Sequence, residues 1–173
     1  MIIILIGYMG SGKSTLGKEL ATRLNSSFLD LDDYISEKES ASIPELFKTK
    51  GEIYFRKKET EYLNELLNTS EDLVLALGGG TPCFGNNMDL LTGNTNLISF
   101  YLKLSIPLLV KRLFKERENR PLISHISTEA ELLEFIGKHL FERIPYYSKS
   151  QFTLNTDNKT QQEILEDLVA HLI

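Results

Sequence analysis

The chain has 173 residues, 42% of them hydrophobic and 25% charged, which is typical of one globular domain with a sizeable core. The net charge of −5 argues against a general nucleic-acid binder, because neutralising phosphates requires a basic face. The single cysteine, Cys83, excludes an internal disulfide framework, and no apolar run approaches the length that spans a bilayer. We expect a cytoplasmic protein with one domain over residues 1–173, no membrane association and no nucleic-acid partner.

Short apolar runs alternate with segments of helical spacing along the chain. The first run, Ile2–Ile6, is β-branched and uninterrupted, as in a strand covered on both faces. The expected strands are Ile2–Ile6, Phe28–Leu31, Leu73–Leu77, Asn96–Leu102 and Phe152–Leu154. The expected helices are Lys13–Leu24, Ile43–Thr49, Glu52–Asn68, Ile106–Glu116, Glu131–Tyr147 and Thr160–Ile173. This alternation predicts an α/β fold with three αβα layers and a five-stranded parallel sheet.

A glycine-rich segment, Gly7–Ser14 with the sequence GYMGSGKS, joins the first strand to the first helix. It matches the phosphate-loop pattern, in which glycines let backbone N–H groups point at phosphate oxygens. Lys13 can reach the terminal phosphates, and the Ser14 hydroxyl is placed to bind Mg²⁺. A dinucleotide fingerprint is excluded, because Thr15 stands where its third glycine would be. We therefore predict a nucleoside triphosphate site.

Aspartates follow the second expected strand. The two-residue period of a strand would turn Asp30 and Asp32 to the same side, where one of them can serve a magnesium site. The alternative is that Asp32 or Asp33 caps the next helix. The phosphate loop favours a site role for Asp30 and Asp32, with Asp33 exposed to solvent.

Three successive glycines, Gly78, Gly79 and Gly80, follow the third expected strand, at the sheet edge where α/β proteins bind ligands. They allow a close approach of the backbone to a ligand, although a flexible turn is the alternative. Arg56 has Glu59 one helical turn later, which can orient it, but a surface ion pair fits the same spacing.

Arg143 lies at the border of an apolar helix face that Leu133, Ile136, Leu140 and Ile144 form. A guanidinium near a core requires an anion, because an unpaired buried charge is costly. The spacing leaves a bound ligand and a structural carboxylate as equal alternatives.

A basic cluster runs from Lys111 to Arg120 in an otherwise acidic chain. It is typical of a lid whose arginines neutralise charge during phosphoryl transfer, although a solvated helix end paired with Glu116 and Glu118 fits the same pattern. The polar stretch Glu116–Thr128 is predicted to be a mobile surface loop. The three histidines receive no role, and Tyr146-Tyr147 is interpreted as packing.

Taken together, these motifs resemble those of shikimate kinases over essentially the whole chain. The motifs that carry the resemblance, in chain order, are GYMGSGKS at Gly7–Ser14, Asp30-Leu31-Asp32, Phe55-Arg56, Gly78-Gly79-Gly80, Arg120-Pro121-Leu122 and Arg143-Ile144-Pro145-Tyr146-Tyr147. The resemblance implies transfer of the γ-phosphoryl group of ATP to the 3-hydroxyl of shikimate, a step of aromatic amino-acid biosynthesis. Another small-molecule kinase, for gluconate or a nucleoside monophosphate, is the alternative, and a non-catalytic ATP-binding regulator is a rival of another class.

On the ATP side, the resemblance implies a Mg²⁺-dependent site. Lys13 would stabilise the transferring group, Ser14 would bind Mg²⁺, and Asp30 would hold the metal through water. Arg120 would move onto ATP on a lid over residues 112–126. The residues around the ATP phosphates would be Gly10, Ser11, Gly12, Lys13, Ser14 and Thr15.

On the acceptor side, the resemblance implies a shikimate site built around residues 32–62. Asp32 would bind ring hydroxyls and act as the base, while Arg56 and Arg143 would clamp the carboxylate. The backbone of Gly79, within the glycine turn, would contact another hydroxyl. A nucleotide acceptor would need more arginines than these two.

Two features depart from the family pattern. The lid before Arg120 is about a residue longer than the commonest form, which affects the match of Arg112, expected near the adenine. The segment 155–159 lacks the arginine that some relatives have there. Because no long spare apolar stripe is present, we expect a monomer.

Overall fold

A computed structural model describes residues 1–173 and contains one parallel sheet with the strand order β2-β3-β1-β4-β5. The strands are β1 (Ile2–Ile6), β2 (Ser27–Asp30), β3 (Leu73–Ala76), β4 (Leu97–Lys103) and β5 (Phe152–Asn155). β1 is central and buried throughout, and its Ile3 lies opposite Val74 of β3 and Ile98 of β4. The predicted α/β class and five-stranded parallel sheet are confirmed.

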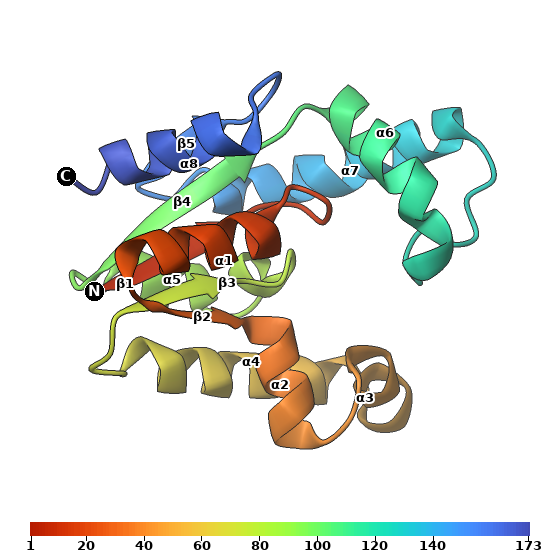
Figure 1. The fold of residues 1–173 in the computed structure, drawn as a ribbon. Helices are drawn as coiled ribbons and strands as arrows, with labels where there is room; N and C mark the ends of the chain where they lie inside the picture. The colour runs from red at the N-terminus through yellow and green to blue at the C-terminus, as the bar shows by residue number, and fades with distance from the viewer.

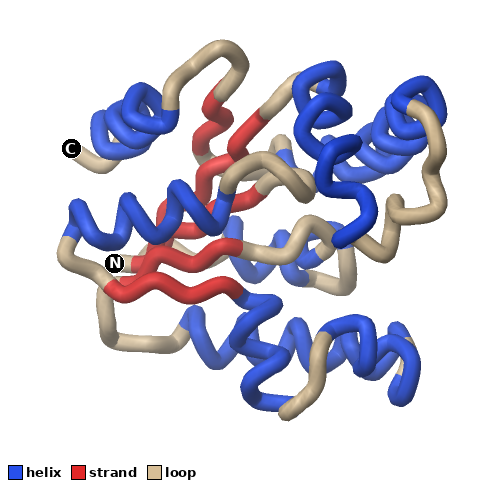
Figure 2. Tube along the Cα trace, turned by 45° about the vertical axis from the view of Figure 1, so that its right-hand side comes forward, coloured by secondary structure: helices blue, strands red, loops and turns tan.

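Helices cover both faces of this sheet (Figure 1). They are α1 (Lys13–Leu24), α2 (Leu31–Glu39), α3 (Ile43–Lys50), α4 (Glu52–Leu67), α5 (Asn87–Thr92), α6 (Ile106–Glu116), α7 (Glu129–Tyr147) and α8 (Gln161–Ala170), with 3₁₀ turns η1 (Thr81–Cys83) and η2 (Arg117–Asn119). Side chains of α1 and α8 share a core with one face, and those of α2 to α7 share a larger core with the other. Figure 2 shows α2, α3 and α4 grouped beyond β2, away from α6. None of these helices is both long and apolar enough to cross a membrane.

Two of the helices, α2 and α5, were not predicted. α2 begins at Leu31, the residue after β2 ends, whereas the expected strand Phe28–Leu31 included that residue. The Asp30 side chain accepts hydrogen bonds from the N–H groups of Asp32 and Asp33, so it caps the helix and ends the strand. Leu31 and Ile35, both buried, are four residues apart, which is the helical spacing in this segment.

The polar stretch Glu116–Thr128 is more structured than the predicted surface loop. Its first residues continue into η2, and its Ile123 and Ile126 are buried in the larger core. The preceding Pro121 and Leu122 are exposed. Two isoleucines therefore anchor the second half of the stretch to the core, although the residues around them are exposed.

Candidate functional site

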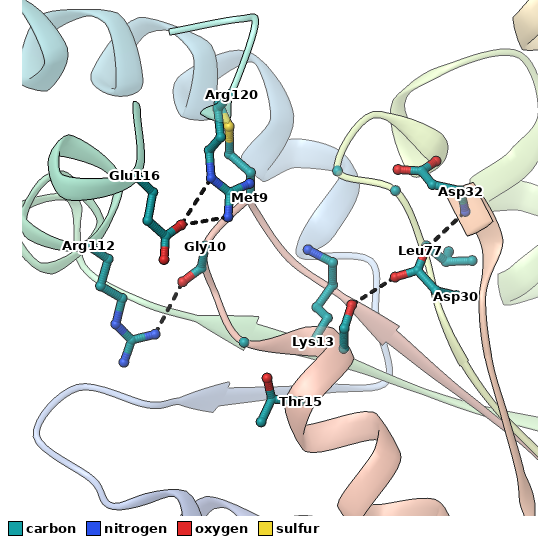
Figure 3. A pocket seen from close by; sticks show the side chains of 14 residues that line it. Met9, Gly10, Lys13, Thr15, Asp30, Asp32, Leu77, Arg112, Glu116 and Arg120 are labelled. Carbon is teal, nitrogen blue, oxygen red and sulfur yellow. Dashed lines mark hydrogen bonds and ion pairs between the residues drawn. The ribbon is translucent and has the colours of Figure 1, made fainter. Parts of the chain in front are cut away.

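The loops that follow β1 and β3, the junction of β2 and α2, and part of α6 line a cavity of about 440 Å³ at one edge of the sheet (Figure 3). Carboxyl ends of parallel strands form the usual ligand site of such sheets. The cavity is lined by Met9, Gly10, Gly12, Lys13, Ser14, Thr15, Asp30, Asp32, Leu77, Gly78, Gly79, Arg112, Glu116 and Arg120. The lining therefore brings together most of the predicted ATP-side residues. Three residues predicted to bind the acceptor, Arg56, Gly80 and Arg143, do not line this cavity.

The phosphate loop has the backbone conformation that its glycines predict. Gly10 and Gly12 have φ angles of 77° and 93°, in the left-handed region that other residues rarely adopt. The Lys13 ammonium donates to the carbonyl oxygens of Gly7, at 2.8 Å, and Tyr8, at 3.0 Å. Burial lowers the pKa of Lys13 to about 8, although two nearby aspartates oppose that shift. Lys13 is therefore mainly charged at neutral pH and is held by neutral acceptors.

Ser14 and Asp30 place two oxygen ligands side by side. The Ser14 hydroxyl donates to Asp30 Oδ2 at 2.8 Å, while Asp30 Oδ1 accepts the backbone N–H groups of Asp32 and Asp33 at 3.0 and 3.4 Å. Mg²⁺ prefers such oxygen donors and takes its other ligands from water and phosphates. No group of three or more His, Cys, Asp or Glu side chains could hold a metal by itself. The pair fits Mg²⁺ in the presence of a phosphate ligand.

Asp32 lines the cavity, but the strand-period argument that predicted its position was wrong. It lies in the first turn of α2, and neither Asp32 nor Asp33 caps this helix, since Asp30 does. Burial raises the pKa of Asp32 to about 6, and the negative charges of Asp30 and Glu59 add to this shift. Asp33 is exposed, as expected. Asp32 thus has a pKa close to neutral pH, as a general base requires.

The three-glycine turn is packed against charged side chains on every side. A Cβ atom at each position would lie 2.8 to 2.9 Å from a different charged group: Asp32 Oδ1 at Gly78, Arg143 Nη1 at Gly79 and Arg56 Nη2 at Gly80. Real Cβ atoms essentially never lie so close to another atom, so a larger residue at any of these positions would push the end of a charged side chain out of its place. The turn brings one carboxylate and two guanidinium groups to the same short stretch of backbone.

Arg56 is held firmly by its own helix and by an aromatic ring. Its Nη1 donates to Glu59 Oε1 at 2.8 Å, and Glu59 is 1% exposed and also accepts the Thr81 hydroxyl at 2.7 Å. The guanidinium carbon lies 3.7 Å from the centre of the Phe84 ring. The Arg56 Nε is buried without a hydrogen-bond partner. Glu59 therefore orients Arg56, as the helical spacing predicted.

Arg143 forms no ion pair, in contrast to Arg56. Its side chain lies next to Gly79 and 5.8 Å from the centre of the Tyr8 ring. The predicted helix face was partly wrong, because the buried positions of α7 are Leu132, Ile136, Leu140 and Tyr147, whereas Leu133 and Ile144 are exposed. Arg143 shares the buried face instead of bordering it. A half-buried guanidinium without a carboxylate partner favours an anionic ligand.

Two arginines, Arg112 of α6 and Arg120 just after η2, approach the cavity across from Asp30 and Asp32 (Figure 3). Arg120 forms an ion pair with Glu116, with Nη2 and Oε2 2.8 Å apart, and Arg112 Nη1 donates to the Gly10 carbonyl at 3.2 Å. The pairing with Glu116 is the one considered as the alternative to a lid role. Because both partners line the cavity, the ion pair leaves Arg120 within the site.

Comparison with known proteins identifies the family of this chain. The family model described as "Shikimate kinase" matches residues 9–173 of this chain. The chain belongs to the shikimate kinase family. It is thus an ATP-dependent kinase, and the predicted resemblance is confirmed. A shikimate kinase of Flavobacterium johnsoniae is 46% identical over 96% of each chain.

Solved shikimate kinases have the same fold. The crystal structure from Bacteroides thetaiotaomicron has a TM-score of 0.89 and 35% identity, covering 99% of this chain and 98% of that one. The structure from Acinetobacter baumannii, described as a complex with shikimate, has a TM-score of 0.83 and 33% identity, covering 99% and 92%. A gluconokinase from Sinorhizobium meliloti is only 17% identical with a TM-score of 0.57, which indicates a shared fold alone.

Two side chains near the candidate site have contacts that the sequence did not predict. Tyr147, interpreted as packing, is buried but also donates its hydroxyl to the Gly79 carbonyl at 2.6 Å. His139, given no role, accepts or donates a 2.8 Å hydrogen bond at Nδ1 with the Tyr8 hydroxyl. These pairs are 68 and 131 residues apart in sequence, so no local pattern could predict them.

Proposed function

We propose that the chain transfers the γ-phosphoryl group of ATP to the 3-hydroxyl of shikimate, giving 3-phosphoshikimate and ADP in aromatic amino-acid biosynthesis. The observation that carries this proposal is the contact of Asp32, Arg143 and Arg56 with the three-glycine turn beside the phosphate loop. Two guanidinium groups and one carboxylate complement a small anion that carries hydroxyls. Family membership supports the same substrates.

On the ATP side, the phosphates bind the backbone N–H groups of Gly10–Thr15 and the ammonium of Lys13. The Ser14 hydroxyl and, through water, Asp30 would hold Mg²⁺, which would neutralise charge on the phosphates. Asp30 suits this indirect contact, because its oxygens already accept three hydrogen bonds from the chain.

On the acceptor side, the shikimate carboxylate binds between Arg143 and Arg56, and its hydroxyls face Asp32 and the Gly79 backbone. Asp32 accepts the proton of the attacking hydroxyl, because its raised pKa makes it a better base than an ordinary carboxylate. The fixed partners of Arg56 and of the glycine turn keep the acceptor in one orientation, which favours in-line transfer. We assign residues 32–62 to this acceptor region.

The lid comprises residues 112–126. In our proposal Arg120 leaves Glu116 and turns to the ATP phosphates when the lid closes, which excludes water from the reaction. The burial of Ile123 and Ile126 favours a motion confined to the first half of the lid. The adenine binds near Arg112, where a second cavity of about 300 Å³ is also lined by Thr156 and Lys159.

We further propose that the enzyme acts as a single-domain monomer in the cytoplasm and has no nucleic-acid or membrane partner. The acidic net charge and the single cysteine support this assignment. Size-exclusion chromatography with light scattering measures the oligomeric state directly.

The decisive experiment measures ADP release from ATP and Mg²⁺ with shikimate, gluconate, AMP or no acceptor. We expect strong stimulation by shikimate alone. Turnover with gluconate or AMP instead would show that the acceptor assignment is wrong while the ATP site stands. Slow hydrolysis that no acceptor changes would favour the non-catalytic regulator.

Replacing Arg143 with alanine is expected to raise the KM for shikimate about 10- to 100-fold, the effect of losing a charge-assisted hydrogen bond. The KM for ATP should change little, because Arg143 is not among the residues lining the phosphate cavity. Steady-state kinetics with each substrate varied measures both constants. Lys138→Ala is the control, since Lys138 is exposed on the same helix. An equal loss of ATP affinity would contradict the assignment.

A further inference from the structure

Tyr8 is the one aromatic residue of the phosphate loop, and it is fully enclosed. Only 2% of its surface is exposed, and its ring forms one wall beside the guanidinium of Arg143. Its backbone carbonyl accepts a hydrogen bond from Lys13. Tyr8 therefore contacts a proposed ATP-side residue through its backbone and a proposed acceptor-side residue through its ring.

The hydroxyl of Tyr8 is bonded to His139, which lies on α7 one helical turn before Arg143. The oxygen and Nδ1 are 2.8 Å apart, and the two rings meet edge to face with centres 5.4 Å apart. The other side of His139 packs against the Phe135 ring, also at 5.4 Å. The partly buried imidazole thus contacts two aromatic rings, and its Nδ1 faces the Tyr8 hydroxyl.

We propose that Tyr8 and His139 are positioning residues that brace α7 against the phosphate loop and so set the orientation of Arg143 toward the acceptor. Arg143 has no carboxylate partner to orient it, whereas Arg56 has Glu59. Its guanidinium lies beside the Gly79 backbone, the Tyr8 ring and Tyr147, whose hydroxyl donates to the Gly79 carbonyl. The brace does for Arg143 what Glu59 does for Arg56. This inference rests on the proposed function, because the acceptor is taken to be shikimate.

The chemistry of the pair fits a permanent brace. Burial raises the pKa of Tyr8 to about 12, so the phenol keeps its proton. Burial and the charge of Arg143 lower the pKa of His139 to about 4, so the imidazole is neutral at physiological pH. Both groups are therefore neutral, and the Tyr8 hydroxyl can donate to Nδ1 when the proton of His139 is on Nε2. No second positive charge arises beside Arg143.

Kinetics of Tyr8→Phe and His139→Leu test the brace. Each should raise the KM for shikimate about 3- to 10-fold, the effect of one neutral hydrogen bond, with kcat and the KM for ATP within about twofold. The double variant should be no worse than either single variant, because both remove the same bond. His139→Asn should restore the KM, since its amide oxygen can accept near the place of Nδ1. His171→Leu, on the opposite face of the sheet, is the control.

Several outcomes would overturn the brace. They are an unchanged shikimate KM in Tyr8→Phe, an equal rise in both KM values, additive effects in the double variant, or no rescue by His139→Asn. If His139→Leu does not fold, the shikimate KM values of Tyr8→Phe and His139→Asn still test the brace. If the wild type turns over shikimate and the variants have the same KM, the brace is refuted but the proposed function stands. If the wild type does not turn over shikimate, both are refuted.

Discussion

Replacing Lys13 with alanine is expected to lower kcat about 10³-fold, as for the loss of a preorganised charged donor at a transferring group. Lys13 has no ion pair in the structure, and its ammonium is held by the carbonyl oxygens of Gly7 and Tyr8. Neutral acceptors keep the charge in place without neutralising it, so its full field is available to the γ-phosphoryl group. The loss should therefore appear in kcat and not only in the KM for ATP.

The control for this experiment is Lys18→Ala, because Lys18 is exposed on the same helix. It should leave kcat unchanged, and circular dichroism should show that both variants fold. The pH dependence of kcat/KM in the wild type provides a second test of Lys13. Since the pKa of Lys13 is about 8, kcat/KM for ATP should fall as the pH rises through that value. An active Lys13→Ala enzyme would refute the ATP site proposed for this loop.

The parts of the fold that were predicted well are those with a strong local signal. β1 and α1 have the predicted bounds, because a buried apolar run and a glycine-rich loop leave little alternative. α6 also has its predicted bounds, Ile106–Glu116. α2 was missed because Asp30, which ends β2, was interpreted as a strand residue instead of a helix cap. The helix cap formed by Asp30 thus determines that the residues after it follow helical spacing and not strand alternation.

In the candidate site, the kinds of residue were predictable but their surroundings were not. The sequence indicates that Arg143 needs an anion, but whether a carboxylate of the protein supplies it depends on distant segments. The structure leaves Arg143 without such a partner and packs it against Gly79 and Tyr8. The roles of Tyr147 and His139 also depend on contacts between segments far apart in sequence. Tertiary contacts of this kind leave no periodic pattern.

Replacing Asp32 with asparagine is expected to lower kcat about 10²- to 10⁴-fold, the usual contribution of a general base. Asparagine preserves the size of the side chain and can still bind a hydroxyl, so the KM for shikimate should change less than kcat. Asp33→Asn is the matched control, because Asp33 is the next residue, is exposed, and contacts Asp30 only through its backbone. Equal losses in both variants would indicate a disturbed α2 and not a missing base.

The pH dependence separates a base from a simple hydrogen-bond partner. A carboxylate accepts a proton only when ionised, and the pKa of Asp32 is raised to about 6 by burial and by its acidic neighbours. The kcat/KM for shikimate of the wild type should therefore rise with pH up to about 6 and then level off. Asp33→Asn should keep this rise, whereas the residual activity of Asp32→Asn should lack it. If the rise persists without the Asp32 carboxylate, another group accepts the proton, and the bound phosphates become the candidate base.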